Sequence, residues 1–377
     1  MRLRHITRHL LPLLLALGIT ACGDNSVMRE PDNAAGDMVL SFTLRIEGQA
    51  GVRSRAEAVP GTDYPYEGYG PTWGEDYPSV VGNDFENRLL KEHFHVLLLD
   101  GNNAVIGKIL SDDLDVLVYN HDGATIYSFL GVLDTAWTPA EFDNITDTKI
   151  MVFANGSAYS DGAALGDITF SHVGGPSATF RAIPMWGVAQ ADLKGIRPGV
   201  ARNVGEVPML RAMAKVVVDI DSELRETVKL TGLTVANCNT AGYQLPRAWD
   251  MIKATDKLDI YNTQRIPADP GAATGLEAAP TADSTAIEFY VPEYANSAEA
   301  EFLMAVDYTV EGEPASKPGL ISLRKYVDGK PAADSGLWPV VRNHIYHYTV
   351  TGIASDGLRF KAEIIDMEEG GDYYYEY

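Results

Sequence analysis

The chain has 377 residues, a length that predicts roughly two domains. Its formal net charge of -22 at pH 7 gives a surface that repels phosphate backbones, so nucleic acid is excluded as a partner. With 46% hydrophobic residues, 35 Gly and 20 Pro, the composition is typical of an all-β protein with many turns rather than of a disordered or coiled-coil chain.

Residues 1–21 predict an export signal, with Arg2, Arg4 and Arg8 ahead of an apolar run that is too short to span a bilayer. The tetrapeptide that ends at Cys22, Ile19-Thr20-Ala21-Cys22, has the form of a bacterial lipobox. The alternative is an ordinary signal peptide with an incidental cysteine. We favour diacylation of Cys22 because a structural role for it would need a disulfide partner, and Cys238 is the one other cysteine. With Cys22 lipidated, Cys238 is expected to be a small buried hydrophobic residue. No later stretch is apolar enough to cross a membrane, so we expect a lipoprotein tethered to the outer membrane by its acyl chains.

Residues 22–55 are interpreted as a propeptide that contains a removable first strand. Apolar and polar residues alternate from Met38 to Ile46, which predicts a strand with one face on a core. Its apolar positions are Met38, Leu40, Phe42, Leu44 and Ile46. The segment Arg53-Ser54-Arg55-Ala56 follows in a Gly- and Ala-rich neighbourhood, the exposed composition at which proteases cut. Our hypothesis is that removal of the strand activates the protein.

Residues 56–205 are expected to form the first domain. It begins with a loop rich in Gly and Pro that carries aromatic residues, namely Tyr64, Tyr66, Tyr69 and Trp73. Apolar runs at 95–99 and 104–110 flank a Gly/Asn turn and predict a β-hairpin. Further strands are expected at 115–119, 125–130, 149–154 and 178–182, and a loop at 155–175.

Residues 206–377 are expected to form the second domain, after Pro198 and Gly205 interrupt the apolar pattern. Strands are predicted at 213–220, 228–236, 287–291, 300–309, 319–326, 345–353 and 358–365, and a surface loop at 268–283. The last strand alternates through Leu358, Phe360, Ala362 and Ile364, and an acidic, tyrosine-rich tail follows it. Many short strands with few helical patterns favour two sandwiches.

The sequence offers little for catalysis or for cofactor and metal binding. His93 and His95 share a strand face and are candidate metal ligands, but a place at the start of a strand explains them better. His344 and His347 fall on opposite faces. Asp112, Asp113 and Asp115 lack the Gly and the Glu of a calcium loop and are interpreted as a solvated turn. No nucleophile, phosphate-loop or zinc motif occurs, so we expect no enzyme and no cofactor.

Taken together, several stretches resemble the fimbrillins, the lipoprotein-derived type V pilins of Bacteroidales. They are Phe85-Glu86-Asn87-Arg88, Met151-Val152-Phe153-Ala154-Asn155, Ala182-Ile183-Pro184-Met185-Trp186-Gly187, Val207-Pro208-Met209-Leu210-Arg211-Ala212-Met213-Ala214-Lys215-Val216, Phe289-Tyr290-Val291-Pro292-Glu293 and Val341-Arg342-Asn343-His344-Ile345-Tyr346. The resemblance extends from the lipobox to the last strand.

This resemblance implies two tandem transthyretin-like β-sandwiches of Greek-key type, and removal of the first strand by an arginine-specific protease. It places the cut after Arg55, with Arg53 as second choice. A strand from another subunit then fills the groove, and residues 358–365 are the candidate donor. Fimbrillin shaft subunits often carry a Trp near the last strand, where this chain has Asp366-Met367-Glu368-Glu369. The resemblance therefore leaves shaft, accessory and tip subunits open.

Three hypotheses describe the function. The first is a pilin of surface fimbriae that polymerises with other subunits by strand exchange and contributes to adhesion to a host protein or glycan. The second is a non-polymerising surface or accessory lipoprotein that binds glycan or host protein through the aromatic loop. The third is a lipoprotein enzyme such as a glycan hydrolase, for which no carboxylate pair stands out.

Overall fold

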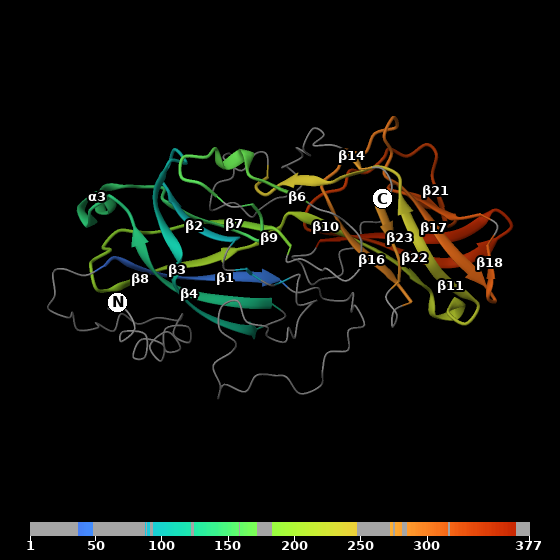
Figure 1. The fold of residues 1–377 in the computed structure, drawn as a ribbon, viewed down its shortest axis with the longest axis horizontal. Helices are drawn as coiled ribbons and strands as arrows, with labels where there is room; N and C mark the ends of the chain where they lie inside the picture. Colours follow the sequence, from blue (N-terminus) through green and yellow to red (C-terminus); the bar gives the residue numbers. More distant parts are fainter. Residues whose placement is uncertain are drawn as a thin grey trace.

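The computed structural model describes residues 37–47, 87, 89–90, 93–121, 124–157, 159–171, 183–246, 272–273, 276–280, 285–315 and 317–366. Several expected features lie outside these ranges: the signal peptide, Cys22, the segment Arg53 to Ala56, the aromatic loop, the strand expected at 178–182 and the acidic tail. Figure 1 shows two β-rich halves arranged along the long axis of the molecule.

The first half is built on one eight-stranded sheet in the order β8-β1-β4-β3-β2-β5-β7-β9. In chain order these strands are β1 (Val39–Glu47), β2 (Phe94–Leu99), β3 (Val105–His121), β4 (Ala124–Asp134), β5 (Lys149–Ala154), β7 (Met185–Gln190), β8 (Ala201–Pro208) and β9 (Leu210–Arg211). The sheet encloses an apolar core to which β1 to β5, β7 and β8 contribute. A second buried apolar cluster lies on the other face of β2, β5 and β7 and includes Leu210 of β9.

Strand β3 lets this sheet pack against itself. Its first part pairs with β2 through Ile109. Its ladder to β4 includes Lys108 and Ile109, shifts register after Ile109, and resumes from Leu114 onward. Such an irregularity bends a strand and increases its twist. The part of the sheet that holds β1 and β4 therefore packs against the part that holds β2 and β5, as two layers over one core.

The second half is a sandwich of two separate sheets over a second core. One sheet has the order β16-β10-β22-β23, and the other has β15-β11-β17-β18 with β19 also paired to β17. In chain order the strands are β10 (Met213–Ile220), β11 (Val228–Val235), β15 (Leu276–Ala278), β16 (Ile287–Pro292), β17 (Leu303–Val310), β18 (Glu313–Pro314), β19 (Gly319–Ser322), β22 (His344–Ala354) and β23 (Gly357–Asp366). Inward-facing residues of both sheets fill the core, as in other sandwiches.

Short elements complete the described fold. They are α3 (Pro139–Asn144), η3 (Leu165–Asp167), β6 (Thr169–Ser171), η4 (Ser222–Leu224), β12 (Cys238–Asn239), β13 (Ala241–Tyr243), β14 (Ala272–Ala273), β20 (Tyr326–Val327) and β21 (Lys330–Pro331). Among them, β6 of the first half pairs with β13 of the second, with Phe170 opposite Gly242. A side chain at position 242 would collide with the Phe170 ring, so Gly permits this contact between the halves.

The all-β, two-sandwich expectation is confirmed, and most predicted strands agree with the structure within a few residues. Three local predictions, of one turn and two loops, are wrong. Asp112, Asp113 and Asp115 lie within β3 rather than in a turn, because the strand continues through its irregularity. The loop expected at 155–175 contains η3 and β6, and the loop expected at 268–283 contains β14 and β15. The boundary expected after residue 205 falls inside β8, and the change from the first sheet to the second lies between Arg211 and Met213.

Candidate functional site

Strand β1 lies inside the first sheet, between two other strands. It pairs with β4 antiparallel along its whole length, from Val39 opposite Val132 to Glu47 opposite Ala124. On its other side it pairs with β8 in parallel. A strand flanked in this way has its backbone donors and acceptors engaged on both sides.

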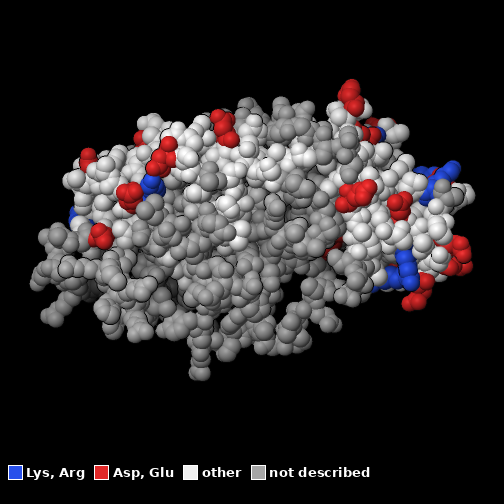
Figure 2. Space-filling model, in the orientation of Figure 1, with Lys and Arg blue, Asp and Glu red and all other residues white. Residues whose placement is uncertain are grey.

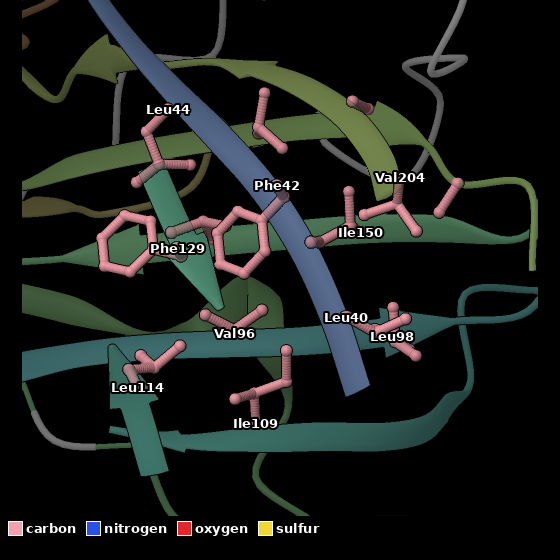
Figure 3. Close-up of a cluster of buried hydrophobic side chains, with 14 of the residues drawn as sticks. Leu40, Phe42, Leu44, Val96, Leu98, Ile109, Leu114, Phe129, Ile150 and Val204 are labelled. Atoms are coloured by element: carbon pink, nitrogen blue, oxygen red, sulfur yellow. The ribbon is translucent and has the colours of Figure 1, made fainter. Parts of the chain in front are cut away.

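The inward face of β1 is a main wall of the first core. Leu40, Leu44 and Ile46 are 0% exposed and Phe42 is 2% exposed. The Phe42 ring stacks on Phe129 of β4 with centroids 5.0 Å apart. Figure 3 shows the side chains of β1 above those of the opposite layer, with Leu40, Phe42, Leu44, Val96, Leu98 and Ile150 labelled. Removal of β1 would therefore open an apolar slot as well as a gap in the sheet.

Strand β8 depends on β1 for its place in the sheet. Within the described residues, β1 is its one ladder partner. Its ladder to β1 shifts register between Ser41 and Thr43, opposite Gly205, which has a φ of 93°. Gly205 therefore forms a bulge in β8. The sequence had instead indicated that the apolar pattern is interrupted at this residue.

The segment around β8 has attachments of its own. The Arg202 guanidinium lies 2.7 Å from the Asp192 carboxylate, and Arg197 lies 2.9 Å from Asp143. Val204 and Val207 are buried in the core. Past its end, β9 pairs with β7. These contacts hold β8 from both ends, so that the slot between β4 and β8 would keep two walls if β1 left.

Among the described strands, β23, which contains the candidate donor residues, lies at the edge of its sheet and pairs with β22. Leu358 and Phe360 are 5% and 2% exposed, whereas Ala362 and Ile364 are partly buried against the second core. Phe360 also donates its backbone N–H to the Gly329 carbonyl at 3.0 Å. The predicted amphipathic strand is thus present, with its apolar face packed in its own half.

The histidines occupy ordinary structural places. His95 lies on β2, stacks on Phe153 at 4.8 Å, and its Nε2 accepts the Tyr159 N–H at 3.3 Å. Burial, and secondarily the nearby His93, lowers its pKa. His344 is buried, and its Nδ1 lies 2.7 Å from the Arg342 carbonyl. Among the described residues, no group of His, Cys, Asp and Glu is arranged to hold a metal ion.

His347 belongs to a polar cluster on the outer face of the second sandwich. Its Nε2 lies 3.3 Å from Asp219 of β10, and its Nδ1 lies 3.8 Å from Glu363 of β23. The pKa of Asp219 is lowered: burial acts to raise it, but hydrogen bonding and the charge of His347 outweigh that effect. This cluster links three strands of one sheet.

Cys238 is 3% exposed, in agreement with the expected small buried residue. Burial raises the pKa of its thiol to about 11. The thiolate, which is the reactive form, is therefore scarce at neutral pH.

A buried polar network lies at the junction of the halves and was not predicted from the sequence. Arg211, at the end of β9, donates to the side-chain oxygen of Asn87, and its backbone N–H donates to Asn343 Oδ1 at 3.1 Å. Arg342 lies 2.7 Å from the Glu293 carboxylate and donates to the Gln244 carbonyl. Gln244 in turn donates to carbonyls of β5 and β7. The sequence held one signal for this network: Arg211 and Arg342 are charged residues within otherwise apolar stretches.

The described surface is acidic over much of its extent. Figure 2 shows acidic side chains distributed over both halves of the described surface, in keeping with the net charge. Within the described part of the chain, none of the helices has the length and apolar character needed to span a bilayer.

No protein-family model matches the chain, and no curated protein matches it. Solved structures do show similarity. The tip fimbrial protein Mfa3 of Porphyromonas gingivalis, truncated at its C-terminus, has a TM-score of 0.44 and 13% identity over 87% of this chain and 99% of its own. A candidate cell adhesion protein of Parabacteroides distasonis has a TM-score of 0.43 and 11% sequence identity, over 88% of this chain and 98% of its own. A candidate cell adhesion protein of Bacteroides eggerthii has a TM-score of 0.41 and 13% sequence identity, over 89% of this chain and 98% of its own. At TM-scores below 0.5 these likenesses carry no inference about the function of this chain.

Proposed function

We propose that this protein is a structural subunit of surface fimbriae. It is exported as a lipoprotein, tethered to the outer membrane through Cys22, and activated when an arginine-specific protease removes the first strand. It then polymerises with other fimbrial subunits by strand exchange, and the fibre contributes to adhesion. The observation that carries the proposal is the position of β1. It is an internal, buried strand between β8 and β4, it lies close to the start of the chain, and the Arg53 and Arg55 pair follows it in sequence.

The physical basis is the cost of an empty slot. Loss of β1 leaves β4 and β8 with unpaired backbone groups and exposes the residues that Leu40, Phe42, Leu44 and Ile46 cover. Burial of these four side chains contributes about 6 to 12 kcal/mol as an upper range. A strand from a second subunit that restores both ladders recovers this energy, so polymers assembled in this way are expected to be long-lived.

Limited proteolysis of the purified precursor tests the proposal. Trypsin cleavage near Arg55 should convert the monomer into ladders that resist SDS. The double variant R53A/R55A should remain monomeric. The matched control R247A/R265A, which removes two arginines from another part of the chain, should polymerise like the wild type.

Two outcomes contradict the proposal. If R53A/R55A still forms ladders, the activation step is wrong. If the clipped wild-type protein stays monomeric, the non-polymerising binder with its residues Tyr64, Tyr66, Tyr69 and Trp73 becomes the better hypothesis. Attachment of the lipid to Cys22 is tested separately. The variant C22S should abolish incorporation of labelled palmitate.

A further inference from the structure

The C-terminal end of β1 lies against two polar residues of β4. Leu44 is paired with Tyr127, and Ile46 is paired with Thr125. The four side chains are 0 or 1% exposed. Paired residues of neighbouring strands lie on the same face of a sheet, so Leu44 and Ile46 sit beside the side chains of Tyr127 and Thr125 on the buried face. While β1 is in place, both polar groups are therefore closed off from water.

These two residues of β4 hold Asn87, and through it the side chain of Arg211. The Tyr127 hydroxyl donates to the Asn87 carbonyl at 2.7 Å, and Asn87 Nδ2 donates to Thr125 Oγ1 at 3.0 Å. The Arg211 guanidinium donates to the side-chain oxygen of Asn87. A guanidinium that is 1% exposed needs well-placed acceptors, because burial of a charge is costly unless hydrogen bonds compensate it. This is one route from β1 to the junction of the halves.

A second route runs through the backbone. The ladder between β1 and β8 ends with Arg45 opposite Pro208. Next to it, the Arg45 carbonyl accepts the N–H of Met209 at 3.1 Å. Met209 is 3% exposed and comes two residues before Arg211. The end of β1 therefore also fixes the segment that leads into β9.

Arg211 in turn is bonded to the start of the second half. Its backbone N–H donates to Asn343 Oδ1 at 3.1 Å, and the N–H of Asn343 donates to the Met213 carbonyl at 2.8 Å. Met213 begins β10, and Asn343 directly precedes β22. These two strands are paired in parallel in the middle of their sheet. The place of Arg211 therefore determines where the second sheet begins relative to the first.

We propose that the C-terminal end of β1, residues 44–46, controls how firmly the two halves are joined. Without a strand in this place, β4 keeps its ladder to β3, but Thr125 and Tyr127 lose their apolar cover and Met209 loses its acceptor. Water then competes for the hydrogen bonds that hold Arg211. The inference concerns the intact chain and does not rest on the proposed function. If that function also holds, a subunit has a firm junction when the place of β1 is filled and a loose one when it is empty.

Amide hydrogen exchange of the unclipped precursor tests the proposal with two variants of one strand. I46A and L40A each truncate an aliphatic side chain of β1 that is 0% exposed. Ile46 is paired with Thr125, whereas Leu40 is paired with Gly131 near the opposite end of β1. Peptides that cover 207–215 and 341–346 report on the junction. In I46A these amides should exchange about tenfold faster than in L40A, because local opening affects the amides next to it most.

Y127F provides a second measurement that keeps the core filled. It removes the hydroxyl that donates to Asn87 and leaves the ring in place. Exchange in the same junction peptides should be faster in Y127F than in the wild type. Y308F, at a buried tyrosine of the second core, is the matched control and should leave exchange at the junction unchanged.

The outcomes separate this inference from the proposed function. Equal exchange at the junction in I46A and L40A, together with wild-type exchange in Y127F, overturns the inference. If I46A does not fold, Y127F decides: faster exchange than in Y308F supports the inference, and an equal rate overturns it. Formation of SDS-resistant ladders by the clipped wild type is a separate measurement, and its success or failure leaves this result unchanged.

Discussion

Arg211 donates a hydrogen bond to the side-chain oxygen of Asn87 from a position 124 residues further along the chain, and both residues are 1% exposed. Asn87 in turn donates to Thr125 at 3.0 Å, and its carbonyl accepts from the Tyr127 hydroxyl at 2.7 Å. Thr125 and Tyr127 belong to β4, the antiparallel partner of β1. Hydrogen bonds therefore connect the junction between the halves to β4, the strand on which β1 lies.

Replacement of Arg211 should destabilise the protein substantially. The variant R211M leaves buried acceptors without a charged donor, which costs about 1.5 to 3 kcal/mol. R211K should recover little, because an ammonium does not reproduce the planar fork of a guanidinium. Urea unfolding measures the free energy of unfolding of both variants. R225M, at a partly buried arginine, is the control. Stability of R211M equal to that of the wild type would contradict a structural role for the network.

The inward face of β1 should dominate its contribution to stability. F42A removes a fully packed ring that stacks on Phe129 and should cost about 3 to 5 kcal/mol in the free energy of unfolding. T43A, on the half-buried outward face, should cost less than about 1 kcal/mol. Chemical denaturation of the unclipped precursor compares the two. Equal losses would mean that β1 does not rest on the core in solution.

Gly187 should not tolerate a side chain. A Cβ at this position would lie 2.3 Å from the Pro208 carbonyl oxygen, a backbone atom at the end of β8. G187A should therefore lower the free energy of unfolding by about 1 to 3 kcal/mol, as overpacking does. G336A is the matched control, because a Cβ there has nothing within 4 Å. The prediction fails if the melting temperatures of the two variants coincide.

His95 should make the first half less stable in acid. Burial lowers its pKa below the ordinary value of 6.5, so the unfolded chain binds the proton more readily than the folded one. The resulting stability is present above pH 6.5 and is lost as the pH falls through the folded-state pKa. H95Q should flatten this part of the profile of unfolding free energy against pH between about 7.5 and 5. An unchanged slope in H95Q would assign the effect to other groups.

The Cys238 thiol should be inert in the folded protein. With a pKa of about 11 and 3% exposure, it should react slowly with a thiol reagent at about pH 8 and rapidly after denaturation. The variant C22S gives the cleanest measurement, since Cys238 is then its one cysteine. Fast labelling without denaturant would show that the second core opens locally.

Much of the fold could be predicted because alternation of apolar and polar residues is a local signal. The pattern of Met38 to Ile46 predicted β1 and its buried face, and the runs at 149–154 and 213–220 matched β5 and β10. The equal spacing of Leu358, Phe360, Ala362 and Ile364 likewise predicted β23. Each of these strands is specified by its own residues.

Other features depend on residues far apart in the chain. Gly205 looked like a break but forms a bulge in β8, because β1 pairs with that strand on both sides of it. Asp112 and Asp113 looked like a turn but continue β3, because β4 pairs with that strand on both sides of the irregularity. Asn87, Arg211 and Gln244 meet only at the junction of the halves. Periodicity determines which face of a strand is buried, whereas the partner of that strand is chosen by packing and backbone hydrogen bonds between distant segments, which only the folded chain brings together.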